Sequence, residues 1–143
     1  MKREFLATAL AVLFALGVSG QAYAAGPRPM ARVIIDCNAT ATGITVTVDA
    51  KTKGGGKPQH VDEAAPVFIL VDQKVGSGFT KVVALGSTFR TTTLPVTASF
   101  NFCSSTGSVL SPDTTAIRGR SSLFIANVGF VSGQCSPSKP PSC

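Results

Sequence analysis

The chain has 143 residues and a formal net charge of +6, and it contains four cysteines, one histidine and no tryptophan. This length suits one domain with a modest core, and the mild basic excess gives no reason to expect nucleic acid as a partner. His60 and Glu63 are the only histidine and the only glutamate after residue 4. With so few general bases, the composition argues against an enzyme and against a bound cofactor or metal.

Residues 1–24 have the three parts of a secretory signal peptide. Lys2 and Arg3 precede an almost wholly apolar run over residues 5–18, and Ala22-Tyr23-Ala24 has the small-residue cleavage pattern. The apolar run is shorter than the roughly 20 residues that a membrane-spanning helix needs. We therefore expect cleavage after Ala24, export to the periplasm or the extracellular space, and no membrane span in the remaining chain.

After residue 24, short runs of alternating Val, Ile, Thr and Phe predict an all-β domain over residues 25–133. The first run changes its apolar parity at Gly43, which leaves two interpretations open. A hairpin with a two-residue turn would set Cys37 opposite Val48 and Asp36 opposite Asp49. A single long strand with a bulge at Gly43 would keep the two aspartates apart.

Residues 51–66, "KTKGGGKPQHVDEAAP", are expected to form an irregular loop because glycine and proline interrupt any periodic pattern. Its basic residues make a candidate binding loop for an acidic partner: Lys51, Lys53 and Lys57. The phosphate-loop pattern is not satisfied. His60, Asp62 and Glu63 are suitable donor types for a metal, but they share one solvated loop, so no metal site is predicted.

Further strands are expected over residues 67–72 and 79–86, joined by a glycine turn, and over 96–102. The run at 96–102 alternates most clearly and places four apolar side chains inside: Val96, Ala98, Phe100 and Phe102. Residues 104–122 are expected to be a long connection, and residues 123–131 a central strand covered on both faces. Six or seven short strands predict a β-sandwich of Ig-like architecture, with a barrel as the alternative.

Residues 134–143 form a proline-rich tail that holds two of the four cysteines. An even cysteine count in an exported chain predicts two disulfides. We favour the pairs Cys37–Cys103 and Cys135–Cys143, with Cys37–Cys143 and Cys103–Cys135 as the alternative. No Cys-x-x-Cys motif is present, so a redox-active role is not expected.

These features favour a non-enzymatic structural or protein-binding module of the cell envelope. Its unpaired strand edges would extend a sheet into another envelope or extracellular protein, or into copies of itself. The alternatives are a secreted inhibitor or ligand-binding protein that uses its basic loops and, last, an unrecognised enzyme. Sugar binding is disfavoured because the mature chain lacks Trp and Tyr and its phenylalanines have core-facing parity.

Overall fold

The computed structural model describes residues 30–54 and 57–143, so the expected signal peptide over residues 1–24 lies outside the described residues. All regular structure in the described part is β-strand. The strands are β1 (Met30–Ala39), β2 (Gly43–Gly54), β3 (Lys57–His60), β4 (Glu63–Ala64), β5 (Val67–Val75), β6 (Gly78–Phe89), β7 (Thr92–Thr93), β8 (Val96–Asn101), β9 (Cys103–Ser104), β10 (Gly107–Ser108), β11 (Thr114–Ile125) and β12 (Gly129–Gln134).

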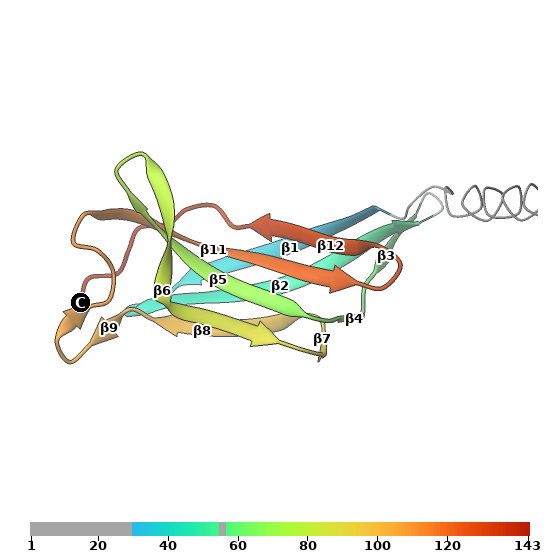
Figure 1. Ribbon diagram of the computed structural model, residues 1–143, viewed down its shortest axis with the longest axis horizontal. Helices are drawn as coiled ribbons and strands as arrows, with labels where there is room; N and C mark the ends of the chain where they lie inside the picture. Colours follow the sequence, from blue (N-terminus) through green and yellow to red (C-terminus); the bar gives the residue numbers. More distant parts are fainter. Residues whose placement is uncertain (1–29, 55–56) are drawn as a thin grey trace, which may run out of the picture.

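The strands form two main sheets whose strands run along the length of the molecule (Figure 1). One sheet has the order β1-β2-β8, with β3 pairing with the end of β2, and the other has the order β12-β11-β5-β6. Both sheets are open, so the protein is a β-sandwich and not a closed barrel, which confirms the predicted fold class. Two short ladders, β4–β7 and β9–β10, lie at opposite ends of the sandwich (Figure 1).

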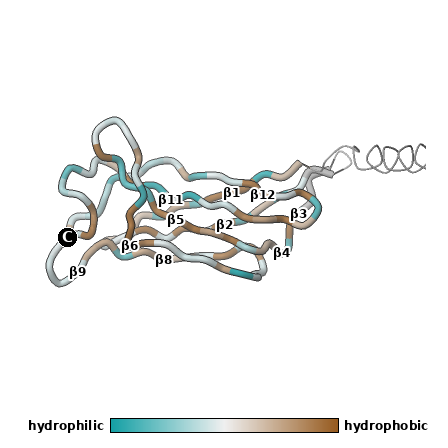
Figure 2. Tube along the Cα trace, viewed as in Figure 1, coloured by the Kyte–Doolittle hydropathy of each residue, from teal (hydrophilic) through white to brown (hydrophobic). Residues whose placement is uncertain are grey.

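Alternate side chains of the long strands fill the space between the sheets, because successive residues of a strand point to opposite faces. The inward residues of β2 are fully buried, and those of β8 are nearly so, as predicted from its alternation: Val96, Ala98 and Phe100, followed by the fully buried Phe102. Figure 2 shows the brown, hydrophobic stretches of β2 and β5 within the molecule, whereas the turn at β9 is pale. The core is therefore aliphatic, with two phenylalanines at the β8 end.

Residues 30–54 form a hairpin, which confirms one of the two interpretations, but its register differs from the predicted one by two residues. Ala39 pairs with Ile44 and Cys37 with Val46, and the backbone N–H of Thr40 donates to the carbonyl of Gly43 at 3.0 Å. Because the turn is longer, Thr42 does not need the positive φ that a two-residue turn would require. It also sets Asp36 opposite Thr47, so the two aspartates are not direct neighbours.

The glycine-rich segment after residue 50 is more regular than predicted. β2 continues to Gly54, and β3 returns antiparallel to it from Lys57, so the expected irregular loop is largely a second hairpin. The expectation was wrong because cross-strand pairing with β2 compensates for weak local propensity.

The expected hairpin of β5 and β6 is confirmed, with its turn at Gly76, which has a φ of 63°. Leu70 pairs with Gly86 but Asp72 pairs with Lys81, so residues 82–85 of β6 face a single residue of β5. Extra residues of this kind bend and twist a strand. The tip of the hairpin accordingly projects from the sandwich (Figure 1).

The expected connection over residues 104–122 was wrong in its second half, because β11 begins at Thr114 and is one of the longest strands. Its inner face carries Gly119 and Ser121 beside apolar residues, and these small residues give a loop-like sequence. The expected central strand over 123–131 was also wrong. Its residues form the β11–β12 hairpin, in which Asn127 has a φ of 64° and Gly129 a φ of 103°.

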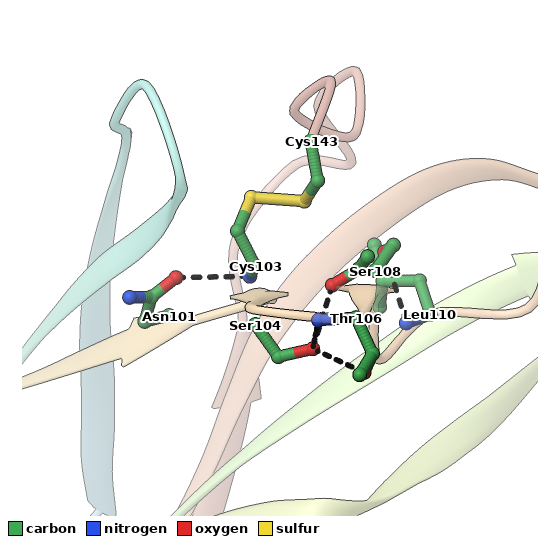
Figure 3. The surroundings of a disulfide bond; sticks show 8 residues. Asn101, Cys103, Ser104, Thr106, Ser108, Leu110 and Cys143 are labelled. Carbon is green, nitrogen blue, oxygen red and sulfur yellow. Dashed lines mark hydrogen bonds between the residues drawn. A yellow bond between two sulfur atoms is a disulfide. The ribbon is translucent and has the colours of Figure 1, made fainter.

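The two disulfides are Cys37–Cys135 and Cys103–Cys143, so both sequence-based pairings were wrong. Cys135 follows β12, which lies beside β1 in the opposite sheet, and this contact brings Cys135 to Cys37. The tail then pairs with β11, where Ile117 and Ser138 exchange two backbone hydrogen bonds of 2.9 and 2.8 Å. That path carries Cys143 to β9, where it bonds to Cys103 (Figure 3).

Candidate functional site

The sequence-predicted basic residues lie on the β2–β3 hairpin. Lys51 is exposed on β2 and pairs across the ladder with His60. The backbones of Lys53 and Lys57 belong to the same hairpin, but their side chains lie outside the described part of the structure. This hairpin carries one described cationic side chain, and that side chain does not define a binding site.

His60 does not meet the two acidic residues that follow it closely in the sequence. Its Nε2 lies 3.5 Å from Oδ1 of Asp49, whose side chain is one-quarter exposed. Across residues 30–54 and 57–143 there is no group of three or more His, Cys, Asp or Glu side chains placed to hold a metal ion. The contact with Asp49 is therefore a local cross-strand interaction.

The sequence "RGR" on β11 is also separate from the β2–β3 hairpin. Nε of Arg118 and Nε of Arg120 lie 3.2 and 2.9 Å from the carboxylate of Asp72, which is 3% exposed on the neighbouring strand β5. The guanidinium of Arg118 also stacks 3.7 Å from the centroid of the Phe79 ring. Asp72 pairs with Lys81 near the β5–β6 turn, and the tip of that hairpin and β3 lie towards opposite ends of the sandwich (Figure 1).

The two sheets are joined along one side of the sandwich and separated along the other. On the joined side, β1 lies against β12, and the Cys37–Cys135 disulfide connects the sheets. On the separated side, β8 pairs only with β2 among the described strands, and β6 pairs only with β5. We call these the closed side and the open side.

A groove of about 490 Å³ lies on the open side, between β6 and β8. Its lining combines apolar side chains at the margin of the core with hydroxyl and amide groups: Ala84, Leu85, Gly86, Ser87, Phe89, Thr97, Ala98, Ser99, Phe100 and Asn101. Leu85 and Phe89 are half-buried and pack against the core, and Ala98 and Phe100 belong to it. We call this surface the β6–β8 groove.

Main-chain groups of β8 also face this groove. The N–H of Phe102 donates to the carbonyl of Thr42 at 2.8 Å, which identifies these two residues as a hydrogen-bonded pair. Because bonded and non-bonded pairs alternate along an antiparallel ladder, Thr97 and Ser99 belong to non-bonded pairs with β2. Their N–H and C=O groups therefore point away from β2, at the free edge of β8.

Unpaired strand edges were predicted from the sequence, but the strands that provide them were not. The order of strands in each sheet decides that, and the order is a tertiary property. The alternation of polar residues at 97, 99 and 101 identified β8 as a half-exposed strand, which is the one local signal of this site.

Comparison with known proteins finds no matching family model, no matching curated protein and no matching solved structure. Within the described residues no helix has the length and hydropathy to cross a membrane. The two disulfides are typical of proteins outside the reducing cytoplasm. Functional inference for this chain therefore depends on its own geometry.

Proposed function

We propose that the protein is an exported, non-enzymatic structural or protein-binding module of the cell envelope, in the periplasm or the extracellular space. It would bind by accepting an extended strand of a partner into the β6–β8 groove. The partner would be another envelope or extracellular protein, or a second copy of this chain. The observation that supports this proposal is the open side, where outward-pointing backbone groups of β8 adjoin apolar side chains.

Strand addition needs these two features together. Backbone hydrogen bonds to an edge strand provide affinity for an extended segment, and alternate side chains of that segment need an apolar surface to cover. Thr97 and Ser99 supply the backbone groups, while the half-buried Leu85 and Phe89 supply the apolar surface. The two disulfides would keep the unfilled groove from opening further, because they tie the opposite side and the C-terminal tail to the sandwich.

The test uses Ser99→Pro and Ser99→Ala. Proline removes an N–H that points away from β2, so the β2–β8 ladder keeps its bonds while an added strand loses one. Ser99→Ala removes the same hydroxyl, which lies 3.2 Å from that of Thr45, and so it is the matched control. Association is measured by sedimentation over a concentration range for self-assembly, and by quantitative capture from native envelope extract for other partners.

We expect Ser99→Pro to weaken the association by about tenfold or more, and Ser99→Ala to change it by less than about twofold. A triple variant, Lys51→Glu, Lys53→Glu and Lys57→Glu, leaves the groove intact and should retain the association. Equal binding by Ser99→Pro and the unaltered protein would contradict the proposal, as would the absence of any association. Loss of binding in the lysine variant alone would favour contact through the β2–β3 hairpin.

A further inference from the structure

A second cavity, of about 540 Å³, lies on the outer face of the sheet formed by β12, β11, β5 and β6. It is lined by Leu70, Arg120, Ser121, Ser122, Ser132, Gly133 and Gln134. Arg120 pairs across the ladders with both Gln134 and Leu70, and Ser122 pairs with Ser132. Directly paired residues share a face, so a guanidinium, an amide and two hydroxyls surround one apolar side chain. We call this cavity the Arg120 pocket.

The charge at the Arg120 pocket is positive. Arg118 and Arg120 share the single carboxylate of Asp72, so the three groups together carry one excess positive charge. The Arg118 side chain is 19% exposed and stacks on Phe79, whereas the Arg120 side chain is 42% exposed. Arg120 contacts Asp72 through Nε, and its two terminal nitrogens have no hydrogen-bond partner among the described residues. The excess charge is therefore presented by Arg120, at the pocket.

Two lysines on the same face of the sheet add to its positive charge. Lys81 pairs with Asp72 across the β5–β6 ladder and is exposed, and Lys74 lies two residues further along β5. A guanidinium with two free nitrogens binds a planar carboxylate in a bidentate manner better than it binds a neutral group. The pocket is thus suited to a ligand that carries a carboxylate.

An aromatic surface adjoins the polar lining. Phe124 and Phe130 pair across the β11–β12 ladder, two residues beyond the Ser122–Ser132 pair, with ring centroids 5.2 Å apart in an edge-to-face arrangement. They are 38% and 64% exposed, which corrects the expectation that the phenylalanines of this chain have core-facing parity. Exposed aromatic rings beside hydrogen-bonding groups are the combination that accommodates a ring with one apolar face and polar edges.

We infer that the Arg120 pocket binds an acidic sugar of the hexuronic type. The carboxylate would pair with Arg120, the ring hydroxyls would bond to Ser122, Ser132 and Gln134, and a neighbouring ring would lie on Phe130. A peptide strand fits less well, because β11 is an interior strand whose backbone groups already bond to β5 and β12. This site is on a different surface from the β6–β8 groove and does not depend on the proposed strand addition.

The probe is a trimer of galacturonic acid, titrated into the full mature chain at 0.15 M salt and followed by calorimetry and by amide chemical shifts. A neutral galactose trimer and a glutamate tripeptide are titrated in parallel. We expect the uronate trimer to bind and to shift the amide signals of Ser122, Ser132 and Gln134. The neutral trimer and the tripeptide should bind at least about tenfold more weakly.

Arg120→Gln should weaken binding of the uronate trimer by about tenfold or more, and Phe130→Ala by about fivefold. Arg90→Gln removes one positive charge from an exposed position outside the lining and should change affinity by less than about twofold. Because Arg120 also contacts Asp72, Phe130→Ala keeps the inference testable if Arg120→Gln fails to fold. No binding, or equal losses in Arg120→Gln and Arg90→Gln, would overturn the inference. Tighter binding of the tripeptide would assign the pocket to acidic peptides instead.

Discussion

The closed and open sides of the sandwich are both built from β-strands, but the two sheets approach each other closely only on the closed side. On the closed side, small residues let the sheets approach one another: Gly133 of β12 faces Val33 of β1, and Gly119 of β11 lies under the Cys37–Cys135 disulfide. On the open side, the larger side chains of Leu85 and Phe89 line the groove between β6 and β8. The sandwich is therefore fixed along one side, and its other side is left with unpaired backbone groups.

The disulfide of the closed side should contribute the largest single effect. In the double variant Cys37→Ser and Cys135→Ser, a cross-link over 98 residues is lost, and the chain-entropy model gives a decrease of about 4–5 kcal/mol in the free energy of unfolding. The variant Cys103→Ser and Cys143→Ser, with a separation of 40, should lose about 4 kcal/mol. Urea denaturation followed by circular dichroism measures both. A decrease below about 1 kcal/mol for the first pair would show that β1–β12 packing alone closes this side.

The close approach at Gly119 should rank second. A Cβ at this position would lie 2.7 Å from Cγ2 of Val46 and 2.9 Å from Sγ of Cys37. Both neighbours are held by the core, so Gly119→Ala should lower the free energy of unfolding by about 2 kcal/mol. The control is Gly78→Ala, where a Cβ meets nothing within 4 Å and a change of less than about 0.5 kcal/mol is expected. Equal effects in the two variants would show that the sheets can separate at no cost.

Amide exchange tests the open side within one strand. By the alternation described above, the N–H groups of Ala98 and Phe100 point to β2, and those of Thr97 and Ser99 point to the groove. In the isolated protein the second pair should exchange about tenfold faster than the first, as measured by hydrogen–deuterium exchange with NMR detection. Equal protection of all four would mean that the groove is already filled in solution. Addition of a strand-donating partner should then protect Thr97 and Ser99 selectively.

The smallest expected effect concerns the solvent face of the β2–β8 ladder. The hydroxyls of Thr47 and Thr97, which are directly paired residues, lie 3.0 Å apart in an exposed hydrogen bond. Thr47→Ala should lower the free energy of unfolding by about 0.5 kcal/mol, because water replaces the lost hydrogen bond. Thermal unfolding detects this difference. A loss above about 2 kcal/mol would indicate that this exposed ladder, and not the core, fixes β8.

Local sequence patterns predicted the features that depend on alternation alone. The inward set of β8, the β5–β6 hairpin and the sandwich class all follow from residues whose apolar positions recur every second residue. The even cysteine count also predicted two disulfides. For the inward set of β8 and the β5–β6 hairpin, the decisive information lies within a window no longer than one hairpin.

The remaining features depend on contacts between distant segments. β11 was missed because the small residues Gly119 and Ser121 occupy inward positions, and at Gly119 the closeness of Val46 and of Cys37 Sγ leaves no room for a side chain. The disulfide pairing requires β12 to lie beside β1, and no residue near Cys135 indicates that neighbour. Both candidate sites were missed for the same reason. The β6–β8 groove requires the sheet order, and the Arg120 pocket requires the register that brings Gln134 and Leu70 to Arg120.

The two disulfides cross in sequence, and this order has a consequence for how the protein must mature. During synthesis Cys37 is made first, followed in order by Cys103, Cys135 and Cys143. Oxidation in order of appearance would join Cys37 to Cys103, a bond that the folded protein does not contain. A maturing chain must therefore either keep Cys37 reduced until β12 has been made or exchange its first bond for another. Where the second route is taken, production of this protein should depend on a catalyst of disulfide exchange, and not on an oxidant alone.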